Sequence, residues 1–485
     1  MIVDSFSKHL QDFGEVGFIE KLWDFIAEVS GLPSVRLAEV VVLETGQVGQ
    51  VIALKKDLVE ILLLSREAAR VGTRVTRTGK KLTMAIDESI LGSSIDGMGT
   101  MLSKSIPSKE KKVLMSADVT PMGISMRQRI NQQLMTGVVL IDMMVPIGKG
   151  QRELVMGDRK TGKTQVLLQI MVNQARLGSV CIYAAIGKKQ SEIKRVENFL
   201  KEAQVWGQSV VVSASVQDSP GEIFSCPNTA MTVAEFFRDH GRDVLLVLDD
   251  MSTHGKFYRE LSLLLRRFPG RDSYPGDIFH IHSKLLERAG NFKIGKREAA
   301  ITCLPVVETI QGDITGYIQT NLMSMTDGHL YFDNELFVKG RRPAINPFVS
   351  VTRVGHQTQS VLAREAGRIL LDLLSSYERT QGFLRFGAEL GESTRQILTM
   401  GDRVLAFFDQ PMNSVVPFEV QIVSLALLIS GMWNGKNLNR MLSGYQSDAS
   451  LKKTIDEMVD KSRGMNELID RARGNQEKLL KAFSE

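Results

Sequence analysis

Cysteine is scarce in this sequence and shows no pairing pattern. Only Cys181, Cys226 and Cys303 occur among 485 residues, and they stand far apart with no C-x-x-C pair. A disulfide framework is therefore not expected. We predict three buried free thiols, as in proteins of a reducing compartment.

Long apolar runs and targeting signals are also absent. No stretch reaches the roughly 18 uncharged apolar residues that a membrane-spanning helix needs. The opening MIVDSFSKHLQDFGEV has the features of neither a signal peptide nor an Arg-rich transit peptide. We therefore expect any association with a membrane to depend on partner proteins.

Basic residues form no tail or block. The formal net charge of +5 results from 60 Lys and Arg against 55 Asp and Glu, spread along the chain. A nucleic-acid-binding protein usually has a clustered basic face instead, so no nucleic-acid partner is expected. Hydrophobic residues make up 43% and charged residues 24%, which is typical of a chain that folds throughout.

The pattern of apolar segments predicts three regions. Short Val-, Ile- and Leu-rich runs with Gly at turns predict a small β-barrel before residue 92, although residues 18–29 also fit an amphipathic helix. Strand-like and helical runs then alternate, as in βαβ units with a mostly parallel sheet. Long helical patterns follow after about residue 347. We predict a multi-domain α/β chain with an N-terminal β-barrel domain at 1–92, a central sheet domain at 93–346 and a C-terminal helical domain at 347–485.

The clearest motif is GDRKTGKT at residues 157–164, which follows the apolar run RELVM and precedes the helical run TQVLLQIM. It matches the G-x-x-x-x-G-K-[ST] pattern of a P-loop in the strand–loop–helix context that this pattern requires. In a P-loop, backbone N–H groups and the helix N-terminus bind phosphate oxygens. The central domain is thus predicted to bind ATP or ADP through Gly157, Asp158, Arg159, Lys160, Thr161, Gly162, Lys163 and Thr164.

Two acids follow a second apolar run. VLLVLDD places Asp249 and Asp250 at the C-terminal end of a predicted strand, where ligands bind in open α/β sheets. Lys163 is expected to reach the β- and γ-phosphates, and Thr164 and Asp249 are expected to hold Mg²⁺. The alternative for the two acids is a solvated strand end.

Longer stretches of the chain resemble the α subunit of F-type ATP synthases, in the same order. They are PIGKGQRELVMGDRKTGKT, DDMSTHGKFYRELSLLLRRFPGRDSYPGDIFHIHSKLLERA, LPVVETIQGDITGYIQTN, SMTDGHLYFDNELFVKGRRPAINPFVSVTRVG and FGAELGESTRQ. The similarity spans about residues 31–421, and RRFPGRDSYPGD separates the chain from the β subunit and from flagellar and export ATPases. The resemblance implies a β-barrel crown, a nucleotide-binding core and a C-terminal helical bundle.

The resemblance also implies a regulatory site. Hydrolysis needs a carboxylate that orients and polarises the attacking water. Catalytic β subunits have Glu just after the strand that follows the P-loop helix, α subunits typically have Gln, and AAIGKKQS places Lys188 there. Because an ammonium group cannot act as that base at neutral pH, we expect the chain alone to have little or no ATPase activity.

Lys160 departs from the family in the same direction, since α subunits usually carry Gln there. Our hypothesis is that Lys160 and Lys188 strengthen anion binding, so that the site holds ATP tightly and depends less on Mg²⁺ than its relatives do. The alternative is that both side chains point to solvent without consequence.

Other functional residues are implied by the resemblance alone. Arg353 in SVTRVG matches the family's arginine finger, which is donated to the neighbouring β site and offsets charge in phosphoryl transfer. Arg342 and Pro343 match the pair that contacts the base, and Gln410 matches the first of two pocket glutamines. Met412 replaces the second glutamine, which leaves the selectivity for adenine over guanine open.

The resemblance implies partners as well. They are a catalytic β-type subunit in an alternating heterohexamer, a central rotor subunit and a peripheral stalk subunit, with membrane contact only through the ion-translocating sector. The expected location is peripheral, on the cytoplasmic face of a bacterial cell membrane. At most about seventeen residues precede the barrel and the linker at residues 91–112 is unlike the family's, so we expect an altered stalk contact and a locally different entry into the central domain.

Two competing interpretations have less support. A catalytic hexameric ATPase, β-like or export-type, would need Glu near Lys188, and the nearest, Glu192, lies four residues too late. A ring-shaped RNA translocase would need aromatic residues that stack on bases, yet residues 31–92 contain no Phe, Tyr or Trp. His280 and His282 alternate in FHIHS and could share one face of a strand, but no acid or Cys stands at metal-ligand spacing.

Overall fold

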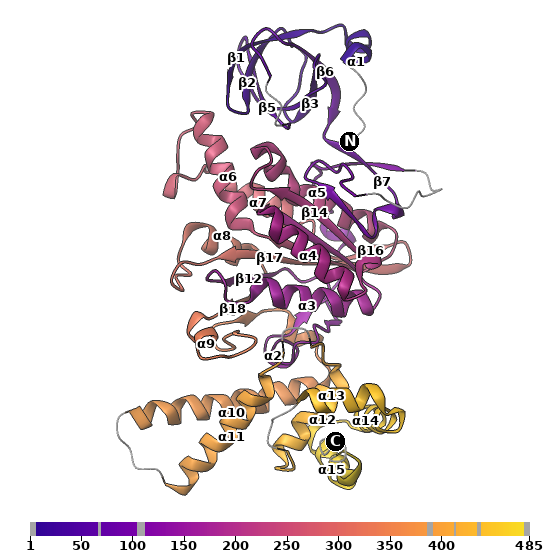
Figure 1. The fold of residues 1–485 in the computed structure, drawn as a ribbon, viewed down its shortest axis with the longest axis vertical. Helices are drawn as coiled ribbons and strands as arrows, with labels where there is room; N and C mark the ends of the chain where they lie inside the picture. The colour runs from indigo at the N-terminus through magenta and orange to yellow at the C-terminus, as the bar shows by residue number, and fades with distance from the viewer. Residues whose placement is uncertain are drawn as a thin grey trace. The chain divides into compact units, whose positions relative to one another are not determined.

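The computed structural model of the chain describes residues 6–65, 69–103, 112–385, 391–411, 414–433 and 438–479 (Figure 1). The chain divides into two compact units. Unit 1 comprises residues 1–129, 175–308 and 313–326, and unit 2 comprises residues 130–174, 309–312 and 327–485. Among the described residues, no helix combines the length and apolar character needed to cross a membrane.

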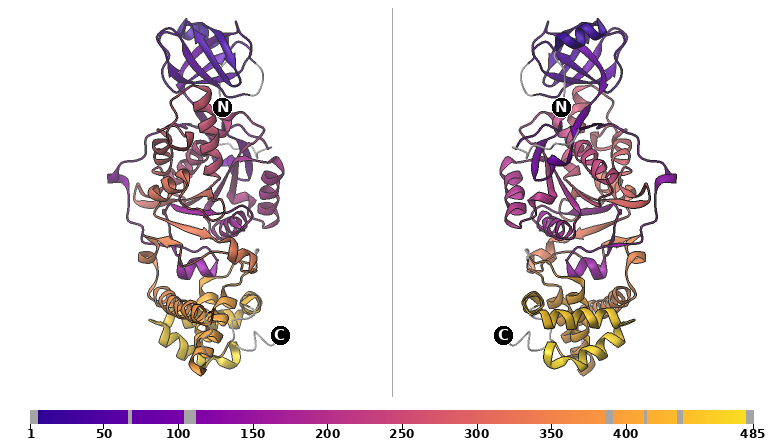
Figure 2. Two further views of the ribbon diagram at one scale, coloured as in Figure 1. Left: turned by 90° about the vertical axis from the view of Figure 1, so that its left-hand side faces the viewer. Right: turned by 90° about the vertical axis from the view of Figure 1, so that its right-hand side faces the viewer.

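Unit 1 begins with a short helix, α1 (Phe6–Phe13), followed by a closed six-stranded barrel (Figures 1 and 2). Residues 18–29 belong to two antiparallel strands, because Ile19, Ala27 and Val29 alternate into the buried barrel core. The strands follow the order β1-β2-β5-β4-β3-β6 and are β1 (Gly17–Trp23), β2 (Ile26–Ser30), β3 (Glu39–Leu43), β4 (Val48–Leu54), β5 (Val59–Leu63) and β6 (Arg74–Lys81).

A mostly parallel sheet forms the rest of unit 1. Strands β13, β15 and most of β17 are apolar in their centres, as expected when helices cover both faces of a sheet. The parallel strands run in the order β17 (Arg297–Glu308), β15 (Val244–Asp249), β13 (Val180–Lys188), β14 (Ser209–Ser215) and β8 (Ser93–Asp96), and β16 (Gly290–Ile294) is antiparallel to β17. The helices of this region are α4 (Gln190–Glu202), α5 (Pro220–Asp239), α6 (Met251–Leu264), α7 (Ile278–Leu286) and α8 (Tyr317–Met325). A separate ribbon pairs β7 (Thr83–Ile86) with β9 (Val113–Ser116).

Unit 2 contains the P-loop and the helical C-terminal region. Strand β12 (Glu153–Gly157) is parallel to β18 (Gly328–Phe332), which is antiparallel to β19 (Val351–Thr352). The P-loop joins β12 to helix α3 (Lys163–Arg176). The remaining elements are β10 (Gln133–Leu134), α2 (Val139–Met144), β11 (Ile147–Gly148), α9 (Asn334–Val338), α10 (Val361–Arg385), α11 (Glu392–Phe408), α12 (Phe418–Ile429), α13 (Leu438–Ser447), α14 (Ala449–Lys461) and α15 (Met465–Gly474).

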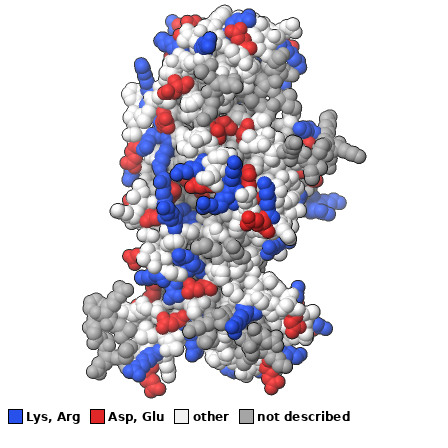
Figure 3. Space-filling model, viewed as in Figure 1, with Lys and Arg blue, Asp and Glu red and all other residues white. Residues whose placement is uncertain are grey.

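The predicted fold class is confirmed, with a closed barrel, a mostly parallel sheet and a helical C-terminal region. The domain boundaries at 92/93 and 346/347 stay predictions. Cys181, Cys226 and Cys303 are buried and form no disulfide, as expected. Figure 3 shows Lys and Arg side chains mixed with Asp and Glu side chains on the face in view, which fits the dispersed charge of the sequence.

One local prediction is wrong. His280 and His282 do not share a strand face, because FHIHS lies in helix α7. Residues two apart on a helix point to nearly opposite sides, so His280 is exposed while His282 is buried against His254, with 3.1 Å between His254 Nδ1 and His282 Nε2. Among the described residues, no group of three His, Cys, Asp or Glu is arranged to hold a metal ion.

Candidate nucleotide-binding site

The P-loop in unit 2 has the backbone that its glycine pattern predicts. Gly157 has a φ of 153°, and a Cβ at this position would lie 2.4 Å from the carbonyl oxygen of Phe332, so no other residue fits. Lys163 is the first residue of α3. Its Nζ donates hydrogen bonds to the carbonyl oxygens of Gly157 at 2.8 Å and Asp158 at 2.5 Å. The ammonium group therefore lies over the loop, in the place from which a P-loop lysine contacts phosphate.

Other P-loop residues divide into buried and exposed positions. Asp158 accepts hydrogen bonds from Thr309 Oγ1 at 2.6 Å and the Gly312 backbone N–H at 3.0 Å, so its carboxylate anchors the segment 309–312. Lys160 is exposed and adopts a φ of 63°. Thr164 lies in the first turn of α3, where it is exposed. The exposure of Lys160 agrees with the alternative in which it points to solvent.

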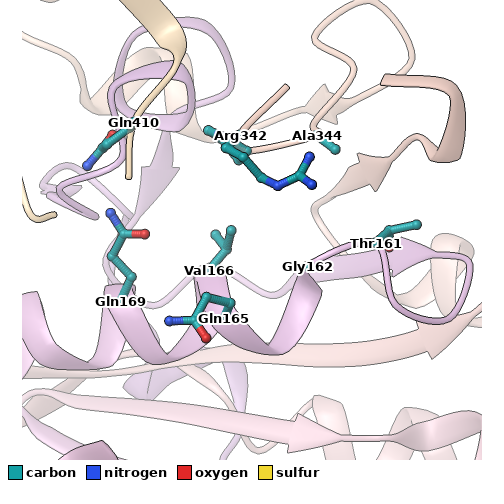
Figure 4. A pocket seen from close by; sticks show the side chains of 9 residues that line it. Thr161, Gly162, Gln165, Val166, Gln169, Arg342, Ala344 and Gln410 are labelled. Carbon is teal, nitrogen blue, oxygen red and sulfur yellow. The ribbon is translucent and has the colours of Figure 1, made fainter. Parts of the chain in front are cut away.

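A small pocket lies next to the P-loop within unit 2 (Figure 4). It brings together Arg342, Pro343 and Gln410, which the sequence placed in a base pocket by resemblance. Met412 lies outside the described residues. The lining residues are Thr161, Gly162, Gln165, Val166, Gln169, Arg342, Pro343, Ala344 and Gln410.

Two polar pocket residues escaped the sequence prediction. Gln165 and Gln169 of α3 line the pocket, and the side chain of Gln169 extends toward Gln410 (Figure 4). Their separation of four residues, directly after the P-loop, puts them on one face of the helix. The sequence contains this signal, because the P-loop motif sets the start of the helix and the spacing then places both glutamines on one helix face.

The polar groups of the pocket wall are largely engaged. Arg342 stacks on the ring of Phe337, with 3.7 Å from its guanidinium carbon to the ring centroid, and donates to the Phe337 carbonyl oxygen at 3.0 Å. The side-chain amide of Gln410 donates to the carbonyl oxygens of Gly137 at 2.7 Å and Ser414 at 2.5 Å. Because both N–H groups of Gln410 are used, this side chain shapes the pocket wall.

In unit 1, Lys188 ends strand β13 beside the end of the parallel strand β15. Its Nζ lies 2.7 Å from Asp249 Oδ1 and 3.3 Å from Asp250 Oδ2, and the three side chains are 19%, 3% and 3% exposed. Burial lowers the pKa of Lys188, but the two carboxylates outweigh this effect and raise that pKa above its ordinary value. The ammonium group of Lys188 is thus fixed by two ion pairs, and the side chain does not point to solvent.

A glycine gives this strand end its geometry. Gly187 has a φ of 63°, and the β13–β14 register shifts between Ile186 and Lys188. A Cβ on Gly187 would lie 2.6 Å from Thr253 Cγ2 at the start of α6. A larger residue would therefore be strained and would push Lys188 away from the acids.

Arg353 follows β19 in unit 2 and is exposed. Its backbone N–H donates to the carbonyl oxygen of Asp327 at 2.9 Å. Within the described ranges, its guanidinium makes no hydrogen bond or ion pair with the chain itself. Asp327 is in turn held by Arg152, whose Nη2 lies 3.0 Å from Asp327 Oδ1.

A buried carboxyl supports the strand that carries Arg353. Gln151 Nε2 donates to Glu153 Oε2 at 2.6 Å and to Thr352 Oγ1 at 3.2 Å. The Glu153 side chain lies over Gly328, where an added Cβ would come within 2.7 Å of Glu153 Oε2. Burial raises the pKa of Glu153 well above its ordinary value, and Arg353 opposes this rise.

Comparisons with known proteins match most of the chain. Residues 137–352 match the family described as "ATP synthase alpha/beta family, nucleotide-binding domain", and residues 359–483 match "ATP synthase alpha/beta chain, C terminal domain". The chain is 38% identical over 416 residues to "ATP synthase subunit alpha" of Clostridium acetobutylicum, covering 85% of this chain and 82% of that protein. It is 36% identical over 447 residues to the protein of the same name from Helicobacter pylori strain G27, covering 92% and 86%.

Proposed function

Because the chain belongs to the ATP synthase alpha/beta family, we propose that it is the regulatory, non-catalytic α subunit of an F-type ATP synthase. Relatives named as alpha subunits match 85% to 92% of its length at 36% to 39% identity. In this function the chain holds ATP or ADP on its P-loop. It contributes Arg353 to the catalytic site of an adjacent β subunit in ATP synthesis and hydrolysis.

The observation that carries this proposal is the ion pair of Lys188. Hydrolysis needs a carboxylate that polarises water, and the residue at the corresponding strand end here is an ammonium held by Asp249 and Asp250. Glu192, the nearest acid in the sequence, lies exposed in the first turn of α4. The competing catalytic interpretation therefore has no observation in its favour.

Nucleotide binding is supported by the P-loop itself. The loop runs from a buried strand to the N-terminus of a helix of 14 residues, which is the arrangement that binds phosphates. Lys163 is directed over the loop by its contacts with the carbonyl oxygens of Gly157 and Asp158. Thr164 and Asp249 stay the predicted Mg²⁺ ligands, and Arg342, Pro343 and Gln410 the predicted walls of a base pocket.

Arg353 supports a role outside the chain. An exposed guanidinium with no partner among the described residues can still offer its planar donors to a phosphate. Its backbone is fixed by Asp327, so the side chain starts from a defined position. We assign it to the γ-phosphate in the site of a neighbouring β-type subunit.

The assembly follows from the same proposal. The partners are a β-type catalytic subunit in an alternating heterohexamer, a central rotor subunit and a peripheral stalk subunit. The complex is placed peripherally on the cytoplasmic face of a bacterial cell membrane.

Co-expression with a β-type subunit tests the proposal. The chain should elute in size-exclusion chromatography as a complex with the β-type subunit. Steady-state ATP hydrolysis should appear in the complex and be absent from the purified chain alone. Turnover by the chain alone at the rate of the complex would contradict the proposal, and so would failure of the two chains to assemble.

A further inference from the structure

One side chain in the pocket of unit 2 presents an unused hydrogen-bond acceptor. Gln169 of α3 lines the pocket and is only 4% exposed. Its Nε2 donates a hydrogen bond to the carbonyl oxygen of Ser414. Among the described residues, its Oε1 has no hydrogen-bond partner. A buried acceptor costs free energy unless a donor reaches it, so this oxygen points to a ligand that carries a donor.

The orientation of the Gln169 amide is set by its partner. If the amide were turned over, its oxygen would face the carbonyl oxygen of Ser414, and two acceptors would repel each other. Figure 4 shows the amide nitrogen of Gln169 on the side of Gln410, which donates to the same carbonyl oxygen at 2.5 Å. The amide oxygen lies on the other side, toward Val166 and Arg342 (Figure 4). The pocket therefore receives an oxygen that can accept a hydrogen bond.

The second glutamine of this wall, Gln410, cannot take the same role. Its Nε2 donates to the carbonyl oxygens of Gly137 at 2.7 Å and Ser414 at 2.5 Å. Its Oε1 accepts a hydrogen bond of 3.1 Å from the backbone N–H of Val139. Because the backbone already occupies this amide, the unused acceptor of the wall belongs to Gln169.

The size of the pocket limits which part of a base can enter it. Its enclosed volume is about 20 Å³, which is room for one water-sized group. The apolar residues Val166, Pro343 and Ala344 also line it and can pack against a base ring. An exocyclic amino group fits into this space, whereas a whole purine ring does not. The pocket is therefore suited to the edge of a base.

Gln169 also lies at a suitable distance from the P-loop. It follows Lys163 by six residues on the same helix, a rise of about 9 Å. A purine nucleotide is long enough to span this distance between its phosphates and the far edge of its base. A nucleotide with its phosphates on the P-loop can thus bring the edge of its base to Gln169 within unit 2.

We propose that Gln169 determines the base specificity of this pocket, because its Oε1 accepts a hydrogen bond from the 6-amino group of adenine. The proposal rests on the proposed nucleotide-binding function. Hypoxanthine carries an oxygen in place of that amino group, so two acceptors would meet and the buried amide oxygen would stay unpaired. The pocket should therefore prefer 6-amino purines over 6-oxo purines.

Three nucleotides test the inference on the unaltered purified chain, by equilibrium dialysis with Mg²⁺ present. ATP carries the 6-amino group, ITP carries an oxygen in its place, and purine riboside triphosphate carries only a hydrogen there. ATP should bind about tenfold or more tightly than either analogue, equivalent to about 1.4 kcal/mol or more. The second analogue separates loss of the donor from repulsion by the oxygen.

A pair of variants then assigns the preference to one side chain. Gln169→Leu removes the acceptor, so its affinity for ATP should fall to that for ITP, while its affinity for ITP changes by less than about threefold. Gln174→Leu is the matched control. Gln174 is also buried on α3, but it lies outside the pocket lining and its Nε2 donates to the Met135 carbonyl oxygen at 2.6 Å. This control should keep the preference for ATP.

Equal affinities of the unaltered chain for the three nucleotides overturn the inference, and so does a preference for ATP that survives in Gln169→Leu. Because the comparison of nucleotides uses the unaltered chain, it decides the matter even if a variant fails to fold. If the unaltered chain binds none of the three nucleotides, the proposed function itself fails, which is a distinguishable result.

Discussion

Lys188 in unit 1 and Arg353 in unit 2 are two cations with opposite surroundings. Lys188 is buried and shared by two carboxylates, whereas Arg353 is exposed and has no ion-pair partner in the described part of the chain. The charge of Lys188 pairs with carboxylates of the same chain, whereas the charge of Arg353 is accessible to a group outside the chain. Burial and ion-pair partners, rather than charge alone, therefore distinguish a cation that pairs with acids of its own chain from one that can contact a neighbouring subunit.

The largest expected effect comes from Arg353. In the complex with a β-type subunit, Arg353→Ala should lower the rate of ATP hydrolysis by about 10³-fold, because charge on the transferred phosphoryl group is no longer offset. ATP binding by the chain and its melting temperature should stay unchanged, since the side chain makes no internal ion pair. Arg353→Lys, which keeps the charge and loses the planar donors, should recover only part of the rate. Full activity of Arg353→Ala would show that Arg353 does not contact the transferred phosphoryl group.

Two lysine-to-methionine substitutions compare the cations inside this chain. Lys188→Met leaves Asp249 and Asp250 buried without their cation, which should lower the free energy of unfolding by about 3–5 kcal/mol. Lys160→Met changes an exposed side chain and should leave the backbone conformation unchanged. It should therefore alter the free energy of unfolding by less than about 0.5 kcal/mol. Denaturant unfolding of the two variants provides the measurement. Equal losses would show that Lys188 is not held as its distances imply.

Buried histidines should make unit 1 sensitive to acid. Burial lowers the pKa of His254 to about 4, and burial together with His254 lowers the pKa of His282 further below its ordinary value. Unfolded histidine protonates near pH 6.5, so the unfolded chain binds more protons between about pH 6.5 and 4. The free energy of unfolding should therefore fall across this range, by up to about 3 kcal/mol from His254.

The measurement is denaturant unfolding at several pH values, with the double variant His254→Asn, His282→Asn as the comparison. The variant should lose stability less steeply as the pH falls. Identical slopes for both proteins would mean that these histidines are protonated in the folded chain.

A smaller effect of opposite sign is expected in unit 2. Burial raises the pKa of Glu153, so the folded chain binds the extra proton above pH 4.5, and the contribution of this group to stability is lost as the pH rises through its raised pKa. Glu153→Gln keeps the shape and cannot ionise. It should remove this loss, a difference on the order of 1 kcal/mol at neutral pH, detectable as a flatter pH profile of unfolding.

Most of the fold could be predicted because its signals are local. The P-loop glycines, the apolar strands and the amphipathic helices of the C-terminal region each determine their own structure. The ambiguity at residues 18–29 was resolved only by the barrel, whose core takes Ile19, Ala27 and Val29 at alternate positions. FHIHS failed for the same reason: alternation of two histidines over a short run does not separate a strand from a helix.

The candidate site was predicted less completely. The sequence shows Lys188 at the position where the family typically has Gln. Its contacts with Asp249 and Asp250 depend on the pairing of β13 with β15 and on the bend at Gly187, which cannot be read from the sequence. Gln165 and Gln169 were missed although their spacing was visible. Glu153 lies over Gly328 and supports the strand that precedes Arg353. This contact depends on the register of β12, β18 and β19, which no single segment of the sequence specifies.

The proposed function requires that this chain bind a triphosphate without hydrolysing it. The most direct test loads the purified chain with ATP and Mg²⁺, removes unbound nucleotide, and follows the identity of the retained nucleotide with time. Intact ATP after a period in which the complex with a β-type subunit completes many turnovers is the predicted result. Conversion of the retained ATP to ADP and phosphate by the chain alone at a comparable rate would contradict the proposed function.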